Sequence, residues 1–222
     1  MLKKIINLFN SDSLYHQALG ECYTMLEIDR QMFNASVDSL RSEKTHEYPL
    51  DIYAMDKKIN QFEREVRRKI MTHLSVGTQQ EDIGPGLVLT SIVIDIERIG
   101  DYTKNIYDLA IKYPGFLSCG KHESQVTSIE LATRDFLNSA IDAFKNQDTD
   151  LARELMEGYK KDISSVGSEI VNEVISGSDK TLLSGQASAL CLYLRYLKRI
   201  SAHSKNLVSS IVNPFERIGY SE

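Results

Sequence analysis

Apolar residues recur every three or four positions along almost the whole chain, which is the period of an amphipathic α-helix. The clearest of these stripes contains Ile52, Met55, Ile59, Phe62, Val66 and Ile70. No segment alternates apolar and polar residues as a half-buried β-strand would. The pattern therefore predicts an all-α fold built from long helices.

Breaks in this periodicity divide the chain into six predicted helices. Gly77 marks the end of the second helix, because glycine is favoured just after a helix C-terminus. Pro85 marks the start of the third, because proline suits the first turn of a helix. The expected helices span residues 12–40, 50–74, 85–113, 123–145, 149–175 and 181–212. A loop rich in Gly, Ser and Cys separates the third helix from the fourth. We therefore expect two tandem three-helix bundles, over residues 1–118 and 119–222.

The third and sixth helices carry a repeated sequence. An offset of 101 residues aligns residues 96–106 (IERIGDYTKNI) with residues 197–207 (LKRISAHSKNL), so that Arg, Ile, Lys and Asn coincide. Helical periodicity would align the apolar positions but not these polar ones. A weaker alignment, with an offset of 104, relates the second helix to the fifth. The chain is thus predicted to be an internal duplication of one three-helix unit.

Two pairs of oxygen-bearing side chains lie in the first half. Glu97 and Asp101 are four residues apart on the third helix, and Asp56 and Asn60 have the same spacing on the second, so each pair shares one helix face. Like charges at this spacing cost about 0.2–0.5 kcal/mol in an isolated helix. A cationic side chain or a metal ion with oxygen ligands would offset that cost. We predict a metal site formed by these four residues, with a solvated helix surface as the alternative.

The second half lacks this arrangement. Its corresponding residues are Lys160, Ser164, Lys198 and Ala202. A lysine offers three donors and no acceptor, so it cannot ligate a cation, although it could replace the charge of an ion or bind an anion. At most one metal site or cluster is therefore expected, in the first half.

Three further features of the repeated segment carry expectations. Gly100 lies inside a helix, where glycine costs about 1 kcal/mol relative to alanine. Close helix–helix approach is the expected reason, and room for a ligand beside Asp101 is the alternative. His203 stands where the first copy has Tyr102 and is expected to be partly exposed. Arg98 and Arg199 recur in both copies and are expected to form ion pairs between helices, with recognition of a partner as the alternative.

Composition narrows the functional classes. The net charge of -5, without a concentrated basic stripe, argues against nucleic-acid binding. Cys22, Cys119 and Cys191 are odd in number and far apart, which fits a reducing, cytoplasmic compartment rather than a disulfide framework. No apolar run reaches the roughly 20 residues of a transmembrane helix. Residues 1–9 (MLKKIINLF) are expected to pack on the bundle as an amphipathic turn, with membrane-surface contact as the alternative.

Signatures of catalysis are missing from the sequence. It has no glycine-rich phosphate loop and no GxSxG, and its five histidines form no ligand cluster. A carboxylate-bridged di-metal enzyme would use paired Glu-x-x-His motifs, and the only such spacing, Glu43 to His46, lies in a charged turn. We favour a non-enzymatic adaptor. A di-metal enzyme and a purely structural dimer are the alternatives.

At the acidic pairs the chain resembles the PhoU family of phosphate-uptake regulators. Residues 97–106 (ERIGDYTKNI) match that family's ERIGDxxxNI signature, and residues 56–60 (DKKIN), followed by Glu63, match its DxxIN-type motif. The likeness covers the layout of nearly the whole chain but is motif-specific only in the first half. It implies two three-helix bundles whose acidic pairs hold iron, zinc, magnesium, manganese or another divalent metal.

The same resemblance implies a functional role without catalysis. The protein would be a negative regulator of phosphate uptake and phosphate signalling. Its partners would be the cytoplasmic ATPase of a phosphate ABC transporter and a phosphate-sensing histidine kinase. It would associate with the membrane only through these partners, as a homodimer. The loss of the acidic motif from the second repeat leaves a divergent relative that serves another transporter as an alternative.

Overall fold

A computed structural model describes residues 13–42, 50–76, 82–159 and 165–220, and these residues contain helices and no strand. The α-helices are α2 (Leu14–Arg41), α3 (Ile52–Ser75), α4 (Ile83–Lys112), α5 (Glu123–Asn146), α6 (Thr149–Tyr159), α7 (Ser165–Ile175) and α8 (Ser184–Val212). Two short 3-10 helices, η2 (Gly120–His122) and η4 (Phe215–Arg217), lie in connections. The predicted all-α fold is confirmed.

Five of the six predicted helices appear with both ends within three residues of their expected positions. The fifth differs, because the structure describes two helices, α6 and α7, where the periodicity predicts one over residues 149–175. Both α6 and α7 pack against α8, and apolar residues of both helices pack against the same core. Residues 160–164, between them, lie outside the described part of the chain. So do the expected amphipathic turn at residues 1–9 and the Glu43–His46 spacing.

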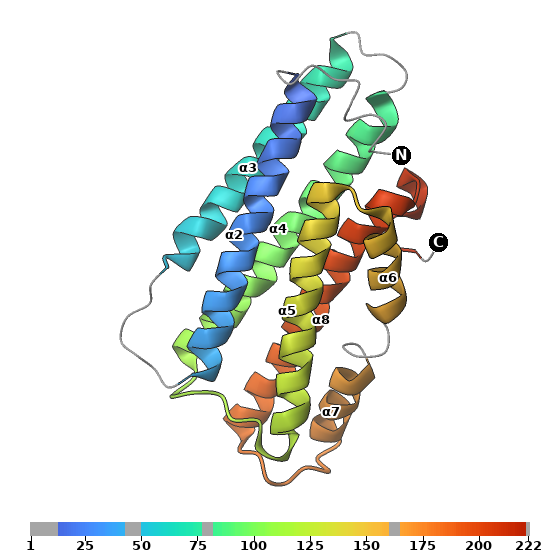
Figure 1. The fold of residues 1–222 in the computed structure, drawn as a ribbon. Helices are drawn as coiled ribbons and strands as arrows, with labels where there is room; N and C mark the ends of the chain where they lie inside the picture. The colour runs from blue at the N-terminus through green and yellow to red at the C-terminus, as the bar shows by residue number, and fades with distance from the viewer. Residues whose placement is uncertain (1–12, 43–49, 77–81, 160–164, 221–222) are drawn as a thin grey trace.

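Helices α4 and α8 are the central elements of the molecule (Figure 1). Helix α4 packs against α2, α3 and α8, whereas α8 packs against α4, α5, α6 and α7. Helix α2 also contacts α5. The two halves of the chain therefore lie side by side along their long axes, joined through the helices that carry the repeated segment.

The buried apolar side chains of both halves form one continuous cluster. It includes Phe33 of α2, Ile96 of α4, Phe144 of α5 and Leu197 of α8, each at most 1% exposed. Burial of this apolar surface is the main force that holds the helices together.

The connection between the halves is tied to both of them. The N–H of Leu117 donates to the carbonyl of Leu40, 2.8 Å away. The Arg41 guanidinium, at the end of α2, donates to the Leu117 carbonyl and to the carboxylates of Glu123 and Glu130 on α5. The predicted domain boundary, between residues 118 and 119, lies next to these contacts of Leu117 and Arg41. The boundary itself stays a prediction.

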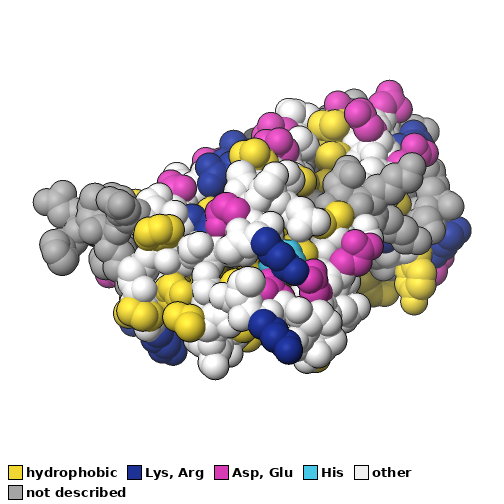
Figure 2. Space-filling view, turned by 90° about the horizontal axis from the view of Figure 1, so that it is seen from below, with side chains coloured by type: hydrophobic (Ala, Val, Ile, Leu, Met, Phe, Trp, Pro, Cys, Tyr) yellow, Lys and Arg dark blue, Asp and Glu magenta, His cyan; other side chains and the backbone are white. Residues whose placement is uncertain are grey.

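The surface gives no sign of a basic patch on the face shown in Figure 2, where lysine and arginine side chains are scattered among acidic and apolar ones. Within the described residues, no helix combines the length and the apolar character needed to cross a lipid bilayer.

Candidate functional site

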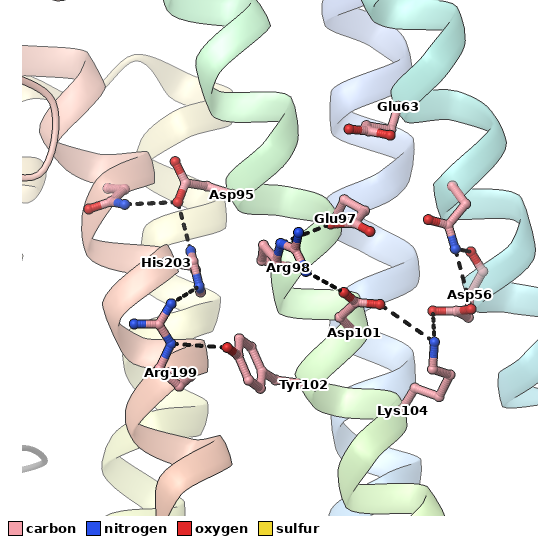
Figure 3. Close-up of polar contacts among 12 residues, drawn as sticks. Asp56, Glu63, Asp95, Glu97, Arg98, Asp101, Tyr102, Lys104, Arg199 and His203 are labelled. Atoms are coloured by element: carbon pink, nitrogen blue, oxygen red, sulfur yellow. Dashed lines mark hydrogen bonds and ion pairs between the residues drawn. The ribbon is translucent and has the colours of Figure 1, made fainter. Parts of the chain in front are cut away.

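The packing of α3 on α4 brings the two predicted oxygen-bearing pairs together around one lysine (Figure 3). The Lys104 ammonium donates to Asp56 Oδ1 at 3.0 Å and to Asp101 Oδ1 at 3.5 Å. Asn60 Nδ2 donates to the carbonyl and to Oδ2 of Asp56, at 3.1 and 3.3 Å. A side-chain cation thus bridges a carboxylate of each pair, because Lys104 lies three residues after Asp101 and on the same face of α4.

Arg98 supplies a second cation from the outer side of α4. Its Nη1 lies 3.0 Å from Asp101 Oδ2, and its Nε lies 3.5 Å from Glu97 Oε2. The expectation of an ion pair between helices is therefore wrong for Arg98. Its partners are on its own helix, because the guanidinium is half exposed and the nearest carboxylates are one and three residues away.

Beneath the two pairs lies a carboxylate that the sequence analysis missed. Asp29 of α2 is 0% exposed, and neither of its carboxylate oxygens has a hydrogen-bond partner among the described residues. Burial, together with the negative charges of Glu97 and Asp56, raises the pKa of Asp29 well above its ordinary value. The sequence did carry a signal, since Asp29 interrupts the apolar stripe that contains Met25 and Met32.

Gly100 makes room for this buried carboxylate. A Cβ atom on Gly100 would lie 2.9 Å from Asp29 Oδ1 and 2.9 Å from Ile59 Cδ1, closer than side chains tolerate. Gly100 lies between Glu97 and Asp101 on α4, and Ile59 lies between the two oxygen-bearing residues of α3. The close approach of helices expected at Gly100 is confirmed, and it places Asp29 at the inner side of both pairs.

The electrostatics of the site reflect its partial burial. Burial and the neighbouring Asp101 raise the pKa of Glu97, whereas Arg98 opposes the shift. Burial alone would lower the pKa of Lys104, but its hydrogen bond to Asp56 and the charges of Asp56 and Asp101 raise it. Lys104 therefore stays charged at neutral pH, in a cluster with more carboxylates than cations.

The donor set fits a hard cation in chemistry, because it contains carboxylate and amide oxygens and a positive charge, the Lys104 ammonium, already lies against Asp56 and Asp101. In the side-chain arrangement of the described residues, however, no three His, Cys, Asp or Glu side chains form a group that could hold a metal ion. A metal ion at Asp56, Asn60, Glu97 and Asp101 would need these side chains to turn away from Lys104. The metal site stays a prediction.

The second repeat has two hydroxyl groups at the positions of Asp29 and Gly100. Ser201, at the position of Gly100, is buried and donates to Thr133 Oγ1 at 3.4 Å. An offset of 104 residues aligns the buried positions of α2 and α5 and pairs Asp29 with Thr133. The contact between Asp29 and Gly100 thus corresponds to a contact between two hydroxyl groups.

Of the four residues that replace the acidic motif, Lys198 donates from α8 to Ser168 Oγ of α7 at 3.0 Å, and Ala202 is half-buried. Lys160 and Ser164 lie outside the described residues.

A second polar network joins α4 to α8, shown to the left of the lysine-centred cluster in Figure 3. Asp95 Oδ1 accepts from His203 Nδ1 at 2.7 Å and from Asn206 Nδ2 at 2.8 Å. Arg199 approaches His203 Nε2 at 3.2 Å and donates from Nε to the Tyr102 hydroxyl at 3.2 Å. Because arginine only donates, His203 must accept at Nε2 and carry its proton at Nδ1.

Two expectations change at this network. His203 is 9% exposed rather than partly exposed, since its ring stacks on Tyr102 and its proton faces Asp95. Arg199 does join two helices, but through the hydroxyl and ring of Tyr102 instead of an ion pair. The predicted ion pair between helices is therefore wrong for Arg199 too, because its partner on α4 is neutral.

Comparisons with known proteins agree with the repeat and with the fold. The model of the PhoU domain matches residues 23–110 and, a second time, residues 127–211. A "Phosphate-specific transport system accessory protein PhoU homolog" from Pseudomonas putida is 28% identical over 166 residues, which is 71% of this chain and 62% of that protein. The alignment therefore spans less than two thirds of that relative.

Two solved structures are similar to this one over most of their length. The crystal structure of PhoU from Pseudomonas aeruginosa matches with a TM-score of 0.75 at 20% identity, covering 91% of this chain and 97% of the other. The phosphate transport system regulatory protein PhoU from Streptococcus pneumoniae matches with a TM-score of 0.69 at 18% identity, covering 90% and 91%. At these identities the likeness establishes a shared fold.

Proposed function

This chain belongs to the PhoU family, and from that premise we propose that it regulates phosphate uptake and phosphate signalling through contacts with other proteins. The observation that carries the proposal is the double match of the PhoU domain, with a complete ERIGDxxxNI signature at residues 97–106. The proposed partners are the cytoplasmic ATPase of a phosphate ABC transporter and a phosphate-sensing histidine kinase. We propose that the protein works in the cytoplasm as a homodimer and without catalysis.

The proposal includes one metal ion in the first repeat. Asp56 and Asn60 of α3 and Glu97 and Asp101 of α4 would hold it. Bound there, the metal would supply positive charge that links α3 to α4. The chemistry of the two pairs supports this assignment, because carboxylate and amide oxygens are the ligands that hard cations prefer.

Metal content of the purified protein tests the site assignment. Mass spectrometry of the wild type is compared with the double variant Glu97→Ala/Asp101→Ala, and Lys198→Ala serves as a matched control in the second repeat. We expect a stoichiometric divalent metal or iron in the wild type and in the control, and none in the double variant. Metal retained by the double variant would rule out these ligands.

The regulatory role is tested separately in cells. Phosphate uptake is measured in a strain without this protein and in the same strain complemented with the wild type, at high external phosphate. Loss of a negative regulator should raise uptake, and complementation should lower it again. Binding of the purified protein to the transporter ATPase and to the kinase is then measured directly. Unchanged uptake together with no binding to either partner would contradict the proposed function.

A further inference from the structure

Helix α3 forms the outer edge of the first half, and the side that it turns to solvent carries positive charge (Figure 1). The helix packs against α2 and α4 through its apolar face. It has six Lys and Arg residues against three Asp and Glu residues, a net charge of +3 in a chain whose net charge is -5. Five of the six cations are exposed, whereas all three acidic residues are partly buried. The charge that α3 presents to solvent is therefore mainly positive.

Three of these cations and two apolar side chains lie in one row, which we call the α3 ridge. It consists of Tyr53, Lys57, Arg64, Arg68 and Met71, spaced three, four or seven residues apart along the helix. Residues at these spacings share one helix face. Tyr53 is 49% exposed and Met71 is 65% exposed. The row does not appear as a run of basic residues in the sequence, because its members meet only on the formed helix.

The cations of the α3 ridge have no partner of their own within the described structure. Neither Lys57, Arg64 nor Arg68 forms a side-chain hydrogen bond or an ion pair with another described residue. Arg67, beside the ridge, differs, because its guanidinium lies 3.1 Å from Glu63 on the same helix. The ridge can therefore pair with carboxylates of another molecule, and arginine does so through two parallel hydrogen bonds.

The composition of the α3 ridge fits a protein surface. Tyrosine, methionine and arginine are enriched at protein–protein interfaces. A helix that binds a membrane surface would lay its apolar face into the lipid, but the apolar face of α3 is used by the core, where Ile59 and Val66 are at most 1% exposed. The net charge of -5 on the whole chain disfavours a nucleic acid. An acidic protein surface is the occupant that these observations favour.

The second repeat has no equivalent row among the described residues. An offset of 104 residues places Ser168 and Asn172 of α7 at the positions of Arg64 and Arg68. Helix α7 contains two glutamates and neither lysine nor arginine. The equivalent of the third cation lies outside the described part of the chain. An acidic partner would therefore distinguish the flank formed by α3 from the flank formed by α7.

We propose that the α3 ridge is a docking surface for an acidic face of a partner protein. Arg64 and Arg68 pair with carboxylates of the partner, and Tyr53 and Met71 pack against it at the two ends of the row. This inference rests on the proposed function, and it adds the surface through which the regulator makes contact and the chemistry that its partner presents. It does not depend on the metal site.

Binding of the purified, full-length protein to the transporter ATPase and to the kinase, measured by surface plasmon resonance, tests the proposal. Arg64→Glu/Arg68→Glu should weaken binding at least roughly tenfold, because attraction to the partner becomes repulsion. Lys180→Glu/Arg195→Glu makes the same change in net charge at exposed residues elsewhere and should bind as the wild type does. Circular dichroism and thermal unfolding should show that all three proteins are equally folded.

Salt provides a second readout of the charged contacts. Raising KCl from about 0.05 to 0.5 M should weaken binding of the wild type, because exposed charges are screened. The residual binding of Arg64→Glu/Arg68→Glu should not weaken in this way. Met71→Ser should lower the affinity and keep the salt dependence of the wild type. An equal weakening by salt in the wild type and the double arginine variant would contradict the role of these charges.

The other outcomes separate the docking surface from the regulatory role. Equal affinity of the wild type and Arg64→Glu/Arg68→Glu would overturn the α3 ridge and leave the regulatory role intact. A wild type that binds neither protein would overturn it as well, and the uptake measurement would then decide the regulatory role alone.

Two further measurements test other occupants of the α3 ridge. The first is binding to phosphatidylcholine vesicles with about one third phosphatidylglycerol, and the second is self-association by analytical ultracentrifugation. The proposal expects Arg64→Glu/Arg68→Glu to match the wild type in both. Loss of vesicle binding or of self-association in this variant, with unchanged affinity for the ATPase and the kinase, would overturn the proposal in favour of a membrane contact or a contact between copies.

Discussion

Gly100 determines how closely α2, α3 and α4 approach at the first-repeat site. Gly100→Ala would place a Cβ 2.9 Å from Asp29 Oδ1 and from Ile59 Cδ1. Overpacking of this kind costs about 1–3 kcal/mol. Alanine regains about 1 kcal/mol through its higher helix propensity, so the substitution is destabilising when the overpacking cost is above the lower end of its range. We expect urea denaturation to show a less stable variant.

Gly20 on the exposed side of α2 provides the control. A Cβ there meets no atom within 4 Å, so Gly20→Ala should stabilise the protein by up to about 1 kcal/mol through helix propensity alone. Changes of opposite sign in the free energy of unfolding would confirm that the contacts at Gly100, rather than the loss of a glycine, destabilise Gly100→Ala. A Gly100→Ala variant as stable as the wild type would contradict it.

Asp29 should make stability depend on pH. Its pKa is raised in the folded state, from an ordinary value of 3.8, so folding favours the protonated form. The stability from this group is complete below about pH 4 and is lost as the pH rises through the folded-state pKa. Asp29→Asn removes the titration and should be the more stable protein at neutral pH. Denaturation from pH 4 to 8 with a chelator present should show a gap that widens with pH, whereas a constant gap would contradict the assignment.

Helices α4 and α8 meet through equivalent positions of the two repeats. The offset of 101 residues relates Asp95 to Tyr196 and Tyr102 to His203. Asp95 contacts His203, and the reciprocal pair, Tyr102 and Tyr196, packs with ring centroids 6.2 Å apart. The interface thus has the form of a two-fold repeat in which one contact is polar and the other is aromatic.

The polar half of this interface should contribute strongly to stability. Asp95→Ala would leave the buried His203 and the partly buried Asn206 without their acceptor, which costs roughly 1–3 kcal/mol. Asp108→Ala, on the same helix, removes only an exposed contact with Tyr53 and should cost less than about 1 kcal/mol. Chemical denaturation of both variants measures the difference. Equal losses of unfolding free energy in the two variants would show that the buried network contributes no more to stability than a surface contact does.

The molecule as a whole is held together by a core that spans both repeats. Ile99 and Ile106 lie on the face of α4 that carries Tyr102 and are 0% exposed. Without the second repeat, this face would meet water.

A fragment of residues 1–118 is therefore expected not to form a stable monomer. Gel filtration and circular dichroism should find it aggregated, self-associated or partly unfolded. The full chain should melt in one cooperative transition. A monomeric fragment that melts as sharply as the full chain would show instead that the first repeat folds independently.

The sequence by itself determined the helical class, most helix ends, the duplication and the family. These follow from the period of apolar residues, from turn residues and from a contiguous motif at residues 97–106, all of which are local properties of the chain. It also identified Gly100 as a close-approach position, because glycine inside a helix needs a reason in packing.

Only the tertiary structure decided which polar groups meet. The burial of Asp29, the bridging place of Lys104, the partners of Arg98 and the contact of His203 with Asp95 depend on how each helix is rotated and shifted against its neighbours. A periodic pattern indicates which face of a helix is buried, but it does not specify the residue that lies opposite. Gly100, which lies against Asp29, and Asp95, which contacts His203, are distant from them in sequence, so these contacts appeared only when the helices were packed together.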